Sequence, residues 1–428
     1  MTLASRMNRS PASVDIDRLG ARAEAMIEAL GAISAEPDRL VRLFLSPEHR
    51  RAAGLVAGWM REAGLEVSED ALGTVRGRLA AQRNGARRLL VGSHIDTVID
   101  AGKYDGPLGV IAGILAAEHF ARAGRRLPFG LDVLAFGDEE GSRFPATLGS
   151  SSACAGVFRA ETLDFADRSG VTLREAVAAY GKSAADIPAA AYARDEAAAY
   201  VEVHIEQGPV LEARNQPLGV VTAIIGQTYL NVEFLGEAGH AGTVPMLMRR
   251  DALAGAAEAI LLGETLARDT KGDVVATVGR LTVSPGATNV IPANVAAIFD
   301  IRSGWEAARA QSVEKLRAGV RAIADKRHLG LTITMTREVA TTPCHAQIQD
   351  AFADAVRALG AEPPRLGSGA GHDGQAMAKL CPIGMLFVRC RGGISHNPME
   401  YAGPRDLGMA VAALIGFIEK FDPDALAR

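Results

Sequence analysis

The sequence LDVLAFGDEEGSRFP, residues 131–145, places three adjacent carboxylates directly after an apolar run. The apolar residues predict a buried strand, and the two glycines that flank the acids predict turns. Asp138, Glu139 and Glu140 would repel one another at a buried strand end, so a positive partner is expected there. Taken alone, the triplet is also typical of a solvated turn or of a helix N-terminus.

On either side of this stretch, strand-like runs alternate with helical ones. RRLLVGSHID (87–96) reads as a strand, GVIAGILAAEHFARAG (109–124) as a helix, and LDVLAFG as the next strand. Residues 17–65 carry apolar side chains at helical spacing. This alternation predicts an α/β protein with a parallel sheet and crossover helices.

A different pattern occupies the middle of the chain. LGVVTAIIGQTYLNVEFLGEAG (218–239) predicts a strand pair, and two later helical segments are separated by strands and turns. After residue 340 the α/β pattern resumes. We therefore predict a discontinuous catalytic domain, 1–218 plus 336–428, and an inserted α+β domain, 219–335, in which two helices pack on an antiparallel sheet.

Composition narrows the class of protein. The 428 residues have a net charge of −4 with mixed signs, which gives no electrostatic reason to expect nucleic acid or anionic membrane as a partner. No apolar stretch is long enough to span a membrane, and the N-terminus lacks the hydrophobic core of a signal peptide. Four scattered cysteines fit a reducing compartment. We expect a soluble, cytoplasmic protein.

Histidine is scarce, and its placement suggests a metal site. His94 and His204 each follow a predicted strand, as the acidic triplet does. Strand carboxyl ends of an open α/β sheet converge on one crevice, and imidazoles with carboxylates suit zinc, manganese or cobalt. A divalent cation would be the missing positive partner, although a strand-end histidine such as His204 is by itself more often a hydrogen-bonded surface residue. Three further histidines lie in glycine-rich or polar loops: His240, His372 and His396.

Eight ordered motifs resemble the hydantoinase/carbamoylase family of di-metal amidohydrolases, relatives of the zinc aminopeptidases and aminoacylases. They are GSHIDTV, YDGPLGV, DEEGSRF, HIEQGP, GHAGTVPMLMRRDA, GATNVIPANVAAIFDIR, SGAGHDGQAMA and GGISHNP. The resemblance implies a di-zinc exopeptidase-like catalytic domain with a smaller lid or dimerisation domain. It also implies a homodimer formed through the inserted domain.

The resemblance implies a ligand set for two divalent ions, zinc or manganese, with cobalt as an alternative. His94 and His204 would bind one ion, Glu140 and His396 the other, and Asp105 would bridge both. Neighbouring residues on an extended backbone face different ways, so Glu140 would bind a metal while the adjacent Glu139 stays free of metal and acts on water.

Three more residues would act beside the metals by the same resemblance. Glu139 would be the general base, and Asp96 would orient His94. His240, from the inserted domain, would donate to the developing oxyanion. Without its motif, His240 would read as an ordinary turn histidine.

Substrate choice follows from the members that share HIEQGP, which act on ureido acids. Gln207 would read the ureido group, and Arg302 would hold the carboxylate with Asn289 beside it, within one subunit or across a dimer. The motifs are most similar to allantoate amidohydrolases, which implies release of ammonia and carbon dioxide from allantoate in purine nitrogen salvage. The alternatives are an N-carbamoyl-L-amino-acid or N-carbamoyl-β-alanine hydrolase, then a metallo-aminopeptidase or a non-catalytic binding descendant.

Overall fold

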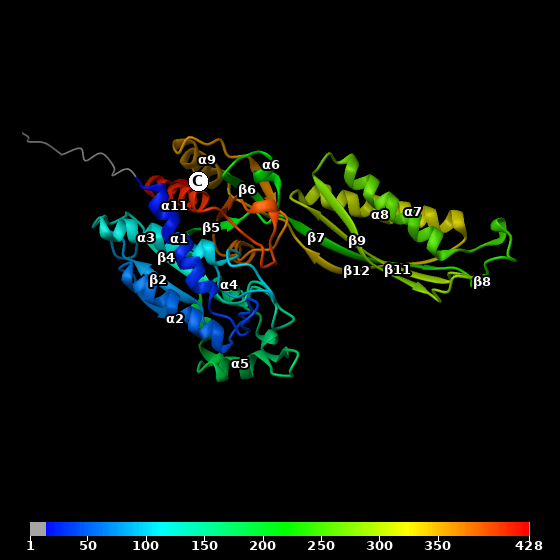
Figure 1. Cartoon of the computed structure of the whole chain (residues 1–428), viewed down its shortest axis with the longest axis horizontal. Coiled ribbons are helices and arrows are strands. Elements are labelled where there is room, and N and C mark those ends of the chain that lie inside the picture. The colour runs from blue at the N-terminus through cyan, green and yellow to red at the C-terminus, as the bar shows by residue number, and fades with distance from the viewer. Residues whose placement is uncertain (1–13, 428) are drawn as a thin grey trace, which may run out of the picture. The chain divides into compact units, whose positions relative to one another are not determined.

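The structure, a computed structural model, describes residues 14–427. These residues form two compact units (Figure 1). The first contains the described residues through Val221, then Cys344–Leu366 and the described residues from His372 onward; the second contains Thr222–Pro343 and Gly367–Gly371. The sequence prediction placed the boundaries at 218/219 and 335/336. Residues 1–13, where no signal peptide was predicted, and Arg428 lie outside the described residues.

A mixed sheet forms the centre of the first unit. Its strands lie in the order β1-β2-β4-β3-β5-β15-β6. β3 runs parallel to β4 and β5, and β15 runs parallel to β5, whereas the flanking pairs are antiparallel. The predicted parallel sheet is therefore only the middle of the observed one. The strands are β1 (Glu66–Glu69), β2 (Val75–Leu79), β3 (Arg88–His94), β4 (Gly130–Phe136), β5 (Ala197–Ile205), β6 (Leu218–Ile224) and β15 (Ile383–Val388).

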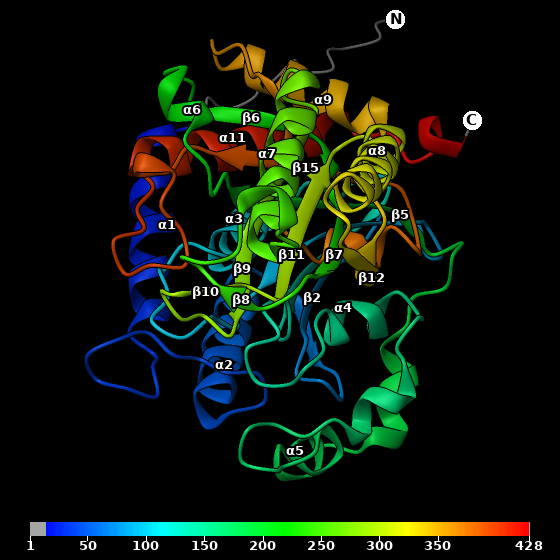
Figure 2. The ribbon, with the colours of Figure 1, turned by 90° about the vertical axis from the view of Figure 1, so that its right-hand side faces the viewer.

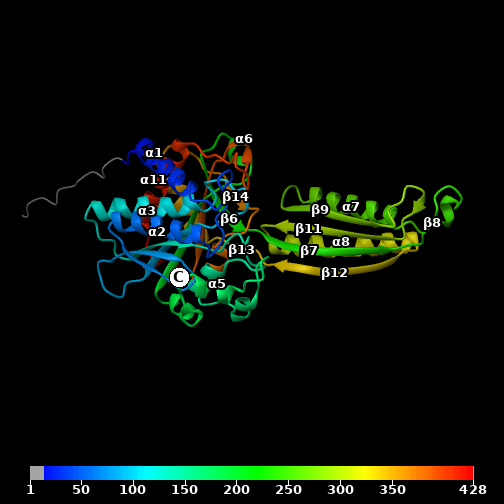
Figure 3. The same cartoon turned by 60° about the horizontal axis from the view of Figure 1, so that its bottom comes forward.

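Buried strands and helices with apolar faces explain why this sheet lies inside the unit. Every residue of β4, β5 and β15 is buried, as expected for strands covered on both faces. Figure 3 shows several of the helices beside the sheet. The longer helices are α1 (Ile16–Gly31), α2 (Pro47–Glu62), α3 (Pro107–Arg122), α9 (Ala346–Ala358) and α11 (Pro404–Lys420); the shorter ones are α4 (Gly149–Cys154), α5 (Leu173–Ala179), α6 (Val210–Ala213) and α10 (Gly374–Met377).

Two glycines allow α1 and α11 to cross with their backbones in close contact. A Cβ added at Gly20 would lie 1.9 Å from the carbonyl oxygen of Pro404. A Cβ added at Gly408 would lie 2.0 Å from the carbonyl oxygen of Ile16. Any larger residue at either position would push the two helices apart.

The second unit is a four-stranded antiparallel sheet with helices α7 and α8 packed on one face (Figure 2). The strand order is β12-β7-β11-β9. β7 alternates buried and half-buried residues, so one face is covered and the other is open. The elements are β7 (Gly226–Leu235), α7 (Ala252–Asp269), β9 (Val274–Ser284), β11 (Asn294–Ser303), α8 (Glu306–Arg327) and β12 (Gly330–Val339), with a small ribbon of β8 (Gly239–His240) and β10 (Val290–Ile291).

The strand pair predicted over residues 218–239 is wrong in its pairing. Both segments are strands, but β6 joins the large sheet beside β15, and β7 joins the small sheet between β12 and β11. Consecutive strands favour a hairpin in a sequence-based prediction, whereas the chain leaves one sheet here and enters another. Two short strands, β13 (Thr342–Pro343) and β14 (Arg365–Ser368), also pair with β6.

Among the helices of residues 14–427, none combines the length and the apolar character needed to cross a membrane.

Candidate metal centre

The first unit brings the five predicted metal ligands together at one end of its central strands. His94 is the last residue of β3, and His204 is the last but one of β5. Glu140 follows β4, Asp105 precedes α3, and His396 lies in the loop between β15 and α11. The parallel strands explain this convergence, because their carboxyl ends share one edge of the sheet.

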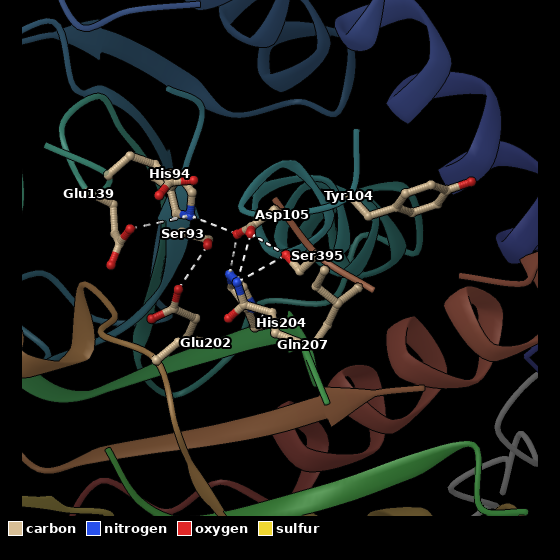
Figure 4. A network of polar contacts seen from close by, with 12 residues as sticks. Ser93, His94, Tyr104, Asp105, Glu139, Glu202, His204, Gln207 and Ser395 are labelled. Atoms are coloured by element: carbon tan, nitrogen blue, oxygen red, sulfur yellow. Dashed lines mark hydrogen bonds and ion pairs between the residues drawn. The ribbon is translucent and has the colours of Figure 1, made fainter. Parts of the chain in front are cut away.

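Asp105 is the centre of the cluster (Figure 4). Its Oδ1 lies 3.4 Å from His94 Nε2 and 3.1 Å from His204 Nε2, and its Oδ2 lies 3.3 Å from His396 Nε2. His396 Nε2 lies 3.5 Å from Glu140 Oε2. Two groups of metal-ligating atoms result, each within 4.8 Å, and they share this one carboxylate: His94–Asp105–His204 and Asp105–Glu140–His396.

Two of the imidazoles are oriented as metal ligands require. His94 Nδ1 lies 3.2 Å from the carbonyl oxygen of Asp96, and His204 Nδ1 lies 2.9 Å from that of Ile205. A carbonyl oxygen can only accept, so each Nδ1 carries a proton, and each Nε2 is the atom that would bind a cation. His204 Nε2 is buried and faces Asp105 Oδ1 at 3.1 Å, with no other hydrogen-bond partner among the described residues. The donor set therefore fits a divalent cation.

The electrostatics of the cluster also fit a cation. Burial raises the pKa of Glu139 well above its ordinary value. Burial, followed by the charge of Asp105, raises the pKa of Glu140 to about 7. Burial disfavours ionised Asp105, but its contacts with the three imidazoles outweigh burial and hold its pKa well below the usual range. Contact with Asp105 raises the pKa of His396 to about 9. A metal ion would stabilise the negative charge that these groups otherwise disfavour.

Asp96 connects the ends of β3 and β4. Its two carboxylate oxygens accept hydrogen bonds from the backbone N–H groups of Glu139 at 3.1 Å and Glu140 at 3.2 Å. Its Oδ1 also lies 3.4 Å from His94 Nδ1. One buried side chain thus positions the proposed base, its neighbour and one imidazole.

Gly137, the first glycine after β4, is required by packing behind the cluster. A Cβ at this position would lie 2.5 Å from Nε2 of the buried His49, at the start of α2. The second glycine, Gly141, has a φ of +61°, which favours glycine in the turn that follows the acids. The acidic stretch is therefore held by close packing on one side and a left-handed turn on the other.

Gln207, predicted to read the ureido group, lies beside Asp105. Its Nε2 donates to Asp105 Oδ2 at 2.7 Å and to Ser395 Oγ at 3.1 Å. Its Oε1 is buried and accepts no hydrogen bond from the described residues. Gln207 lies in the loop after β5 and has a φ of +56°, a left-handed conformation in which its side chain reaches Asp105.

The three predicted residues of the second unit divide into two places. His240, in β8, and Asn289 lie side by side, because Ala241 N donates to the carbonyl oxygen of Asn289 at 2.9 Å. His240 is exposed, and its Nδ1 accepts from Gly242 N at 3.0 Å, so its Nε2 carries the proton. Arg302 lies near the opposite end of β11 from this ribbon.

Arg302 already has a carboxylate partner in its own unit. Its guanidinium forms a two-pronged pair with Asp300, with Nε 3.0 Å and Nη2 2.8 Å from Oδ2. Its Nη1 donates to the carbonyl oxygen of Gly369 at 2.9 Å. The side chain is only about one-third exposed, with a relative exposure of 34%. Asp300 therefore fixes the plane of the guanidinium, and a substrate carboxylate would share its remaining protons.

Several residues of the centre were not predicted from the sequence. His372, whose role was left open, is buried with its ring 4.5 Å from that of His204, and it forms a further close group with Glu202 and His204. Ser395 Oγ lies 2.8 Å from Asp105 Oδ2 and 2.9 Å from Glu400 Oε2, so its single proton is shared between the two carboxylates. Their position in SHNPME, on either side of the proline turn beside His396, is the signal that could have found them.

Comparisons with known proteins show the family of this chain. Residues 90–420 match peptidase family M20/M25/M40. A probable allantoate deiminase of Oryza sativa subsp. japonica is 40% identical over 94% of this chain and 88% of its own length. An N-carbamoyl-L-amino acid amidohydrolase of Geobacillus stearothermophilus is also 40% identical, over 92% of this chain and 97% of its own.

A solved structure extends the likeness to the fold. An amidase of the hydantoinase/carbamoylase family from Burkholderia multivorans is 33% identical and has a TM-score of 0.89, covering 95% of this chain and 98% of that one. This agreement confirms the predicted α/β fold. The chain belongs to peptidase family M20/M25/M40 and, within it, to the hydantoinase/carbamoylase amidohydrolases.

Proposed function

We propose that the protein is a two-metal amidohydrolase that cleaves the C–N bond of the ureido group in a small ureido acid, with allantoate as the first candidate. The observation that carries this proposal is the single carboxylate of Asp105, which faces three imidazoles and is shared by two ligand groups. The names of the rice and Geobacillus relatives support hydrolysis of this bond type. We propose zinc or manganese as the ions, with cobalt as a substitute.

The chain's own residues would carry the proton transfers. Divalent cations bound at the five ligands would supply Lewis acidity and lower the pKa of water. Glu139, whose Oε2 lies 4.0 Å from His94 Nε2, would take a proton from the attacking water and pass it to the leaving nitrogen. The raised pKa of Glu139 suits a group that must hold that proton between the two steps. His240 Nε2–H would donate to the carbonyl oxygen as negative charge develops there.

Recognition of the substrate would use complementary polar groups. The unpaired Oε1 of Gln207 can accept from a ureido N–H next to Asp105. Arg302, held flat by Asp300, would pair with the substrate carboxylate, and Asn289 would donate beside His240. An aminopeptidase would not need Gln207, Asn289 and Arg302 together, because its substrate has no ureido group.

The second unit supports a homodimer whose sites are shared between subunits. Asn294 and Arg302 are separated by eight residue steps of β11, which is about 26 Å of strand, and His240 lies beyond the Asn294 end (Figure 1). A small ureido acid cannot span that distance, so His240 and Arg302 of one chain would serve different substrate molecules. Exposed apolar side chains on α7 and the edge strand β9 would contribute to the contact: Leu261, Val275 and Leu281.

We also propose that the protein works in a reducing, cytoplasmic setting. All four cysteines are buried free thiols: Cys154, Cys344, Cys381 and Cys390. Burial raises the pKa of each thiol, which disfavours the thiolate that oxidation requires.

The proposed function is tested by ammonia release from allantoate and from a panel of N-carbamoyl-amino acids, with metal-loaded and chelator-treated protein side by side. Ammonia from allantoate that is lost on chelation and restored by metal would support the proposal. The Geobacillus relative makes N-carbamoyl-L-amino acids the second candidate, and turnover of these alone would replace allantoate. Turnover of dipeptides alone would contradict the reading of Gln207 and Arg302.

A further inference from the structure

Glu400 is a buried carboxylate that reaches into the loop that carries Asp105. Only 5% of the residue is exposed. Its Oε1 accepts hydrogen bonds from the backbone N–H groups of Tyr104 at 2.8 Å and Asp105 at 3.1 Å. Its Oε2 lies 2.9 Å from Ser395 Oγ, whose single proton it shares with Asp105 Oδ2. Glu400 is separated from the end of β15 by eleven residues. Its side chain therefore connects two backbone N–H groups and one hydroxyl from separate parts of the chain.

Ser395 continues this chain of contacts to the shared carboxylate. Its Oγ lies 2.8 Å from Asp105 Oδ2, and Gln207 Nε2 donates to the same oxygen at 2.7 Å (Figure 4). Gln207 also donates to Ser395 at 3.1 Å. Asp105 is thus fixed at its backbone by Glu400 and at its carboxylate by two side chains, one of which Glu400 holds in place.

The chain leaves room for these contacts at two glycines. A Cβ at Gly102 would lie 2.3 Å from Glu400 Oε1, so a side chain there would expel the carboxylate. A Cβ at Gly393 would lie 2.4 Å from the carbonyl carbon of Gly208, so the loop of Ser395 packs directly on the loop of Gln207. The close packing at Gly102 and at Gly393 therefore keeps Glu400 and Ser395 in place beside Asp105.

We propose that Glu400 is a positioning residue that presets Asp105 and the loop of His396 for metal binding. The inference rests on the proposed metal centre and adds to it a residue that does not itself contact a metal ligand's coordinating atom. Without the carboxylate, two backbone donors would lose their acceptor and Ser395 Oγ would lose one of its two carboxylate neighbours, so the orientation of Asp105 would relax. The second ligand group, which contains His396 and Asp105, would be affected most.

The variant Glu400→Gln tests this role, because it keeps the shape and the oxygen that accepts from the backbone but removes the charge and places an amide NH2 group against Ser395 Oγ. We expect the weaker of two metal equivalents to bind about 10- to 100-fold less tightly, measured by titration of metal-free protein with Co²⁺ and by the visible absorption of the bound ion. Ser395→Ala should weaken the same equivalent. The double variant should bind this equivalent no less tightly than the single variant with the lower affinity, because both substitutions remove the contact between Glu400 and Ser395.

Asp70→Asn is the matched control. Asp70 Oδ1 likewise accepts from two backbone N–H groups, of Leu72 at 2.9 Å and Thr74 at 3.0 Å, in a loop that holds none of the five ligands. This variant should bind both equivalents as the wild type does.

Three results would overturn the inference. Wild-type affinity and an unchanged Co²⁺ spectrum in Glu400→Gln would show that Asp105 is positioned without Glu400. An equal loss in Asp70→Asn would assign the effect to general loop stability. A wild-type protein that binds no metal would overturn both the proposed metal centre and the role of Glu400. Failure of the Glu400 role alone differs from this result, because the wild-type protein would then still bind metal.

Discussion

Glu139 and Glu140 are neighbours in sequence, but their carboxylates face different partners. Glu140 Oε2 lies 3.5 Å from His396 Nε2, whereas Glu139 Oε2 lies 4.0 Å from His94 Nε2, and both glutamates form a close group with His94. We expect Glu139→Gln to lower kcat by about 10²- to 10⁴-fold, because the amide cannot accept a proton. Ammonia release measures this effect.

Metal content separates the two glutamates. Glu139→Gln should keep both metal equivalents, whereas Glu140→Gln should lose one, as measured by elemental analysis after dialysis. Loss of metal from Glu139→Gln would instead assign that residue to the ligand set.

His49 predicts a loss of stability in acid. Its ring packs against Phe44 and Tyr180, and neither ring nitrogen has a hydrogen-bond partner among the described residues. Burial lowers the pKa of His49 to about 4. Between pH 6.5 and 4, His49 is therefore protonated in the unfolded chain but neutral in the folded chain. The contribution of this group to the free energy of unfolding is complete above pH 6.5. It falls as the pH drops toward 4, by at most about 1.4 kcal/mol per pH unit.

His49→Phe removes this titration while keeping an aromatic ring. The urea midpoint of the variant should change less between pH 6.5 and 4 than that of the wild type. Parallel pH profiles for the two proteins would show that His49 does not contribute to the acid sensitivity.

At the scale of elements, the crossing of α1 and α11 depends on Gly408. Gly408→Ala should destabilise the first unit by about 1 to 3 kcal/mol, because the added methyl meets the carbonyl oxygen of Ile16. Gly416→Ala, on the same helix, would meet only Ala355 Cβ at 3.7 Å, an ordinary contact. That control should be neutral or stabilising by up to about 1 kcal/mol, since alanine favours helix. Equal urea midpoints for the two variants would contradict the close crossing.

The elements also show what the sequence could and could not predict. Buried runs such as that of β4 and the residues at their ends could be identified, because burial on both faces gives a continuous apolar pattern. The partners of β6 and β7 could not, because pairing depends on which sheet each strand enters. His49 was missed for a related reason: its importance comes from contacts with residues far away in the chain, which a local pattern does not contain.

At the scale of the whole molecule, the separation of His240 from Arg302 predicts complementation between inactive variants. His240→Ala and Arg302→Ala should each lose most activity alone. Co-refolded in equal amounts, they should recover about a quarter of wild-type activity, because half of the dimers would be mixed and each would hold one intact site. No recovery, despite mixed dimers on a tagged pull-down, would show that both residues serve the same subunit.

The ends of the second unit's long segment lie next to each other. β13 pairs with β6 within this unit, so that Pro343 lies opposite Ala223 and Thr342 opposite Ile224. A segment whose two ends meet can enter or leave a gene at a single point without disturbing the order of the strands that precede and follow it. Joining Val221 to Cys344 through a short linker would therefore remove this long segment and leave the order of the first unit's remaining strands unchanged.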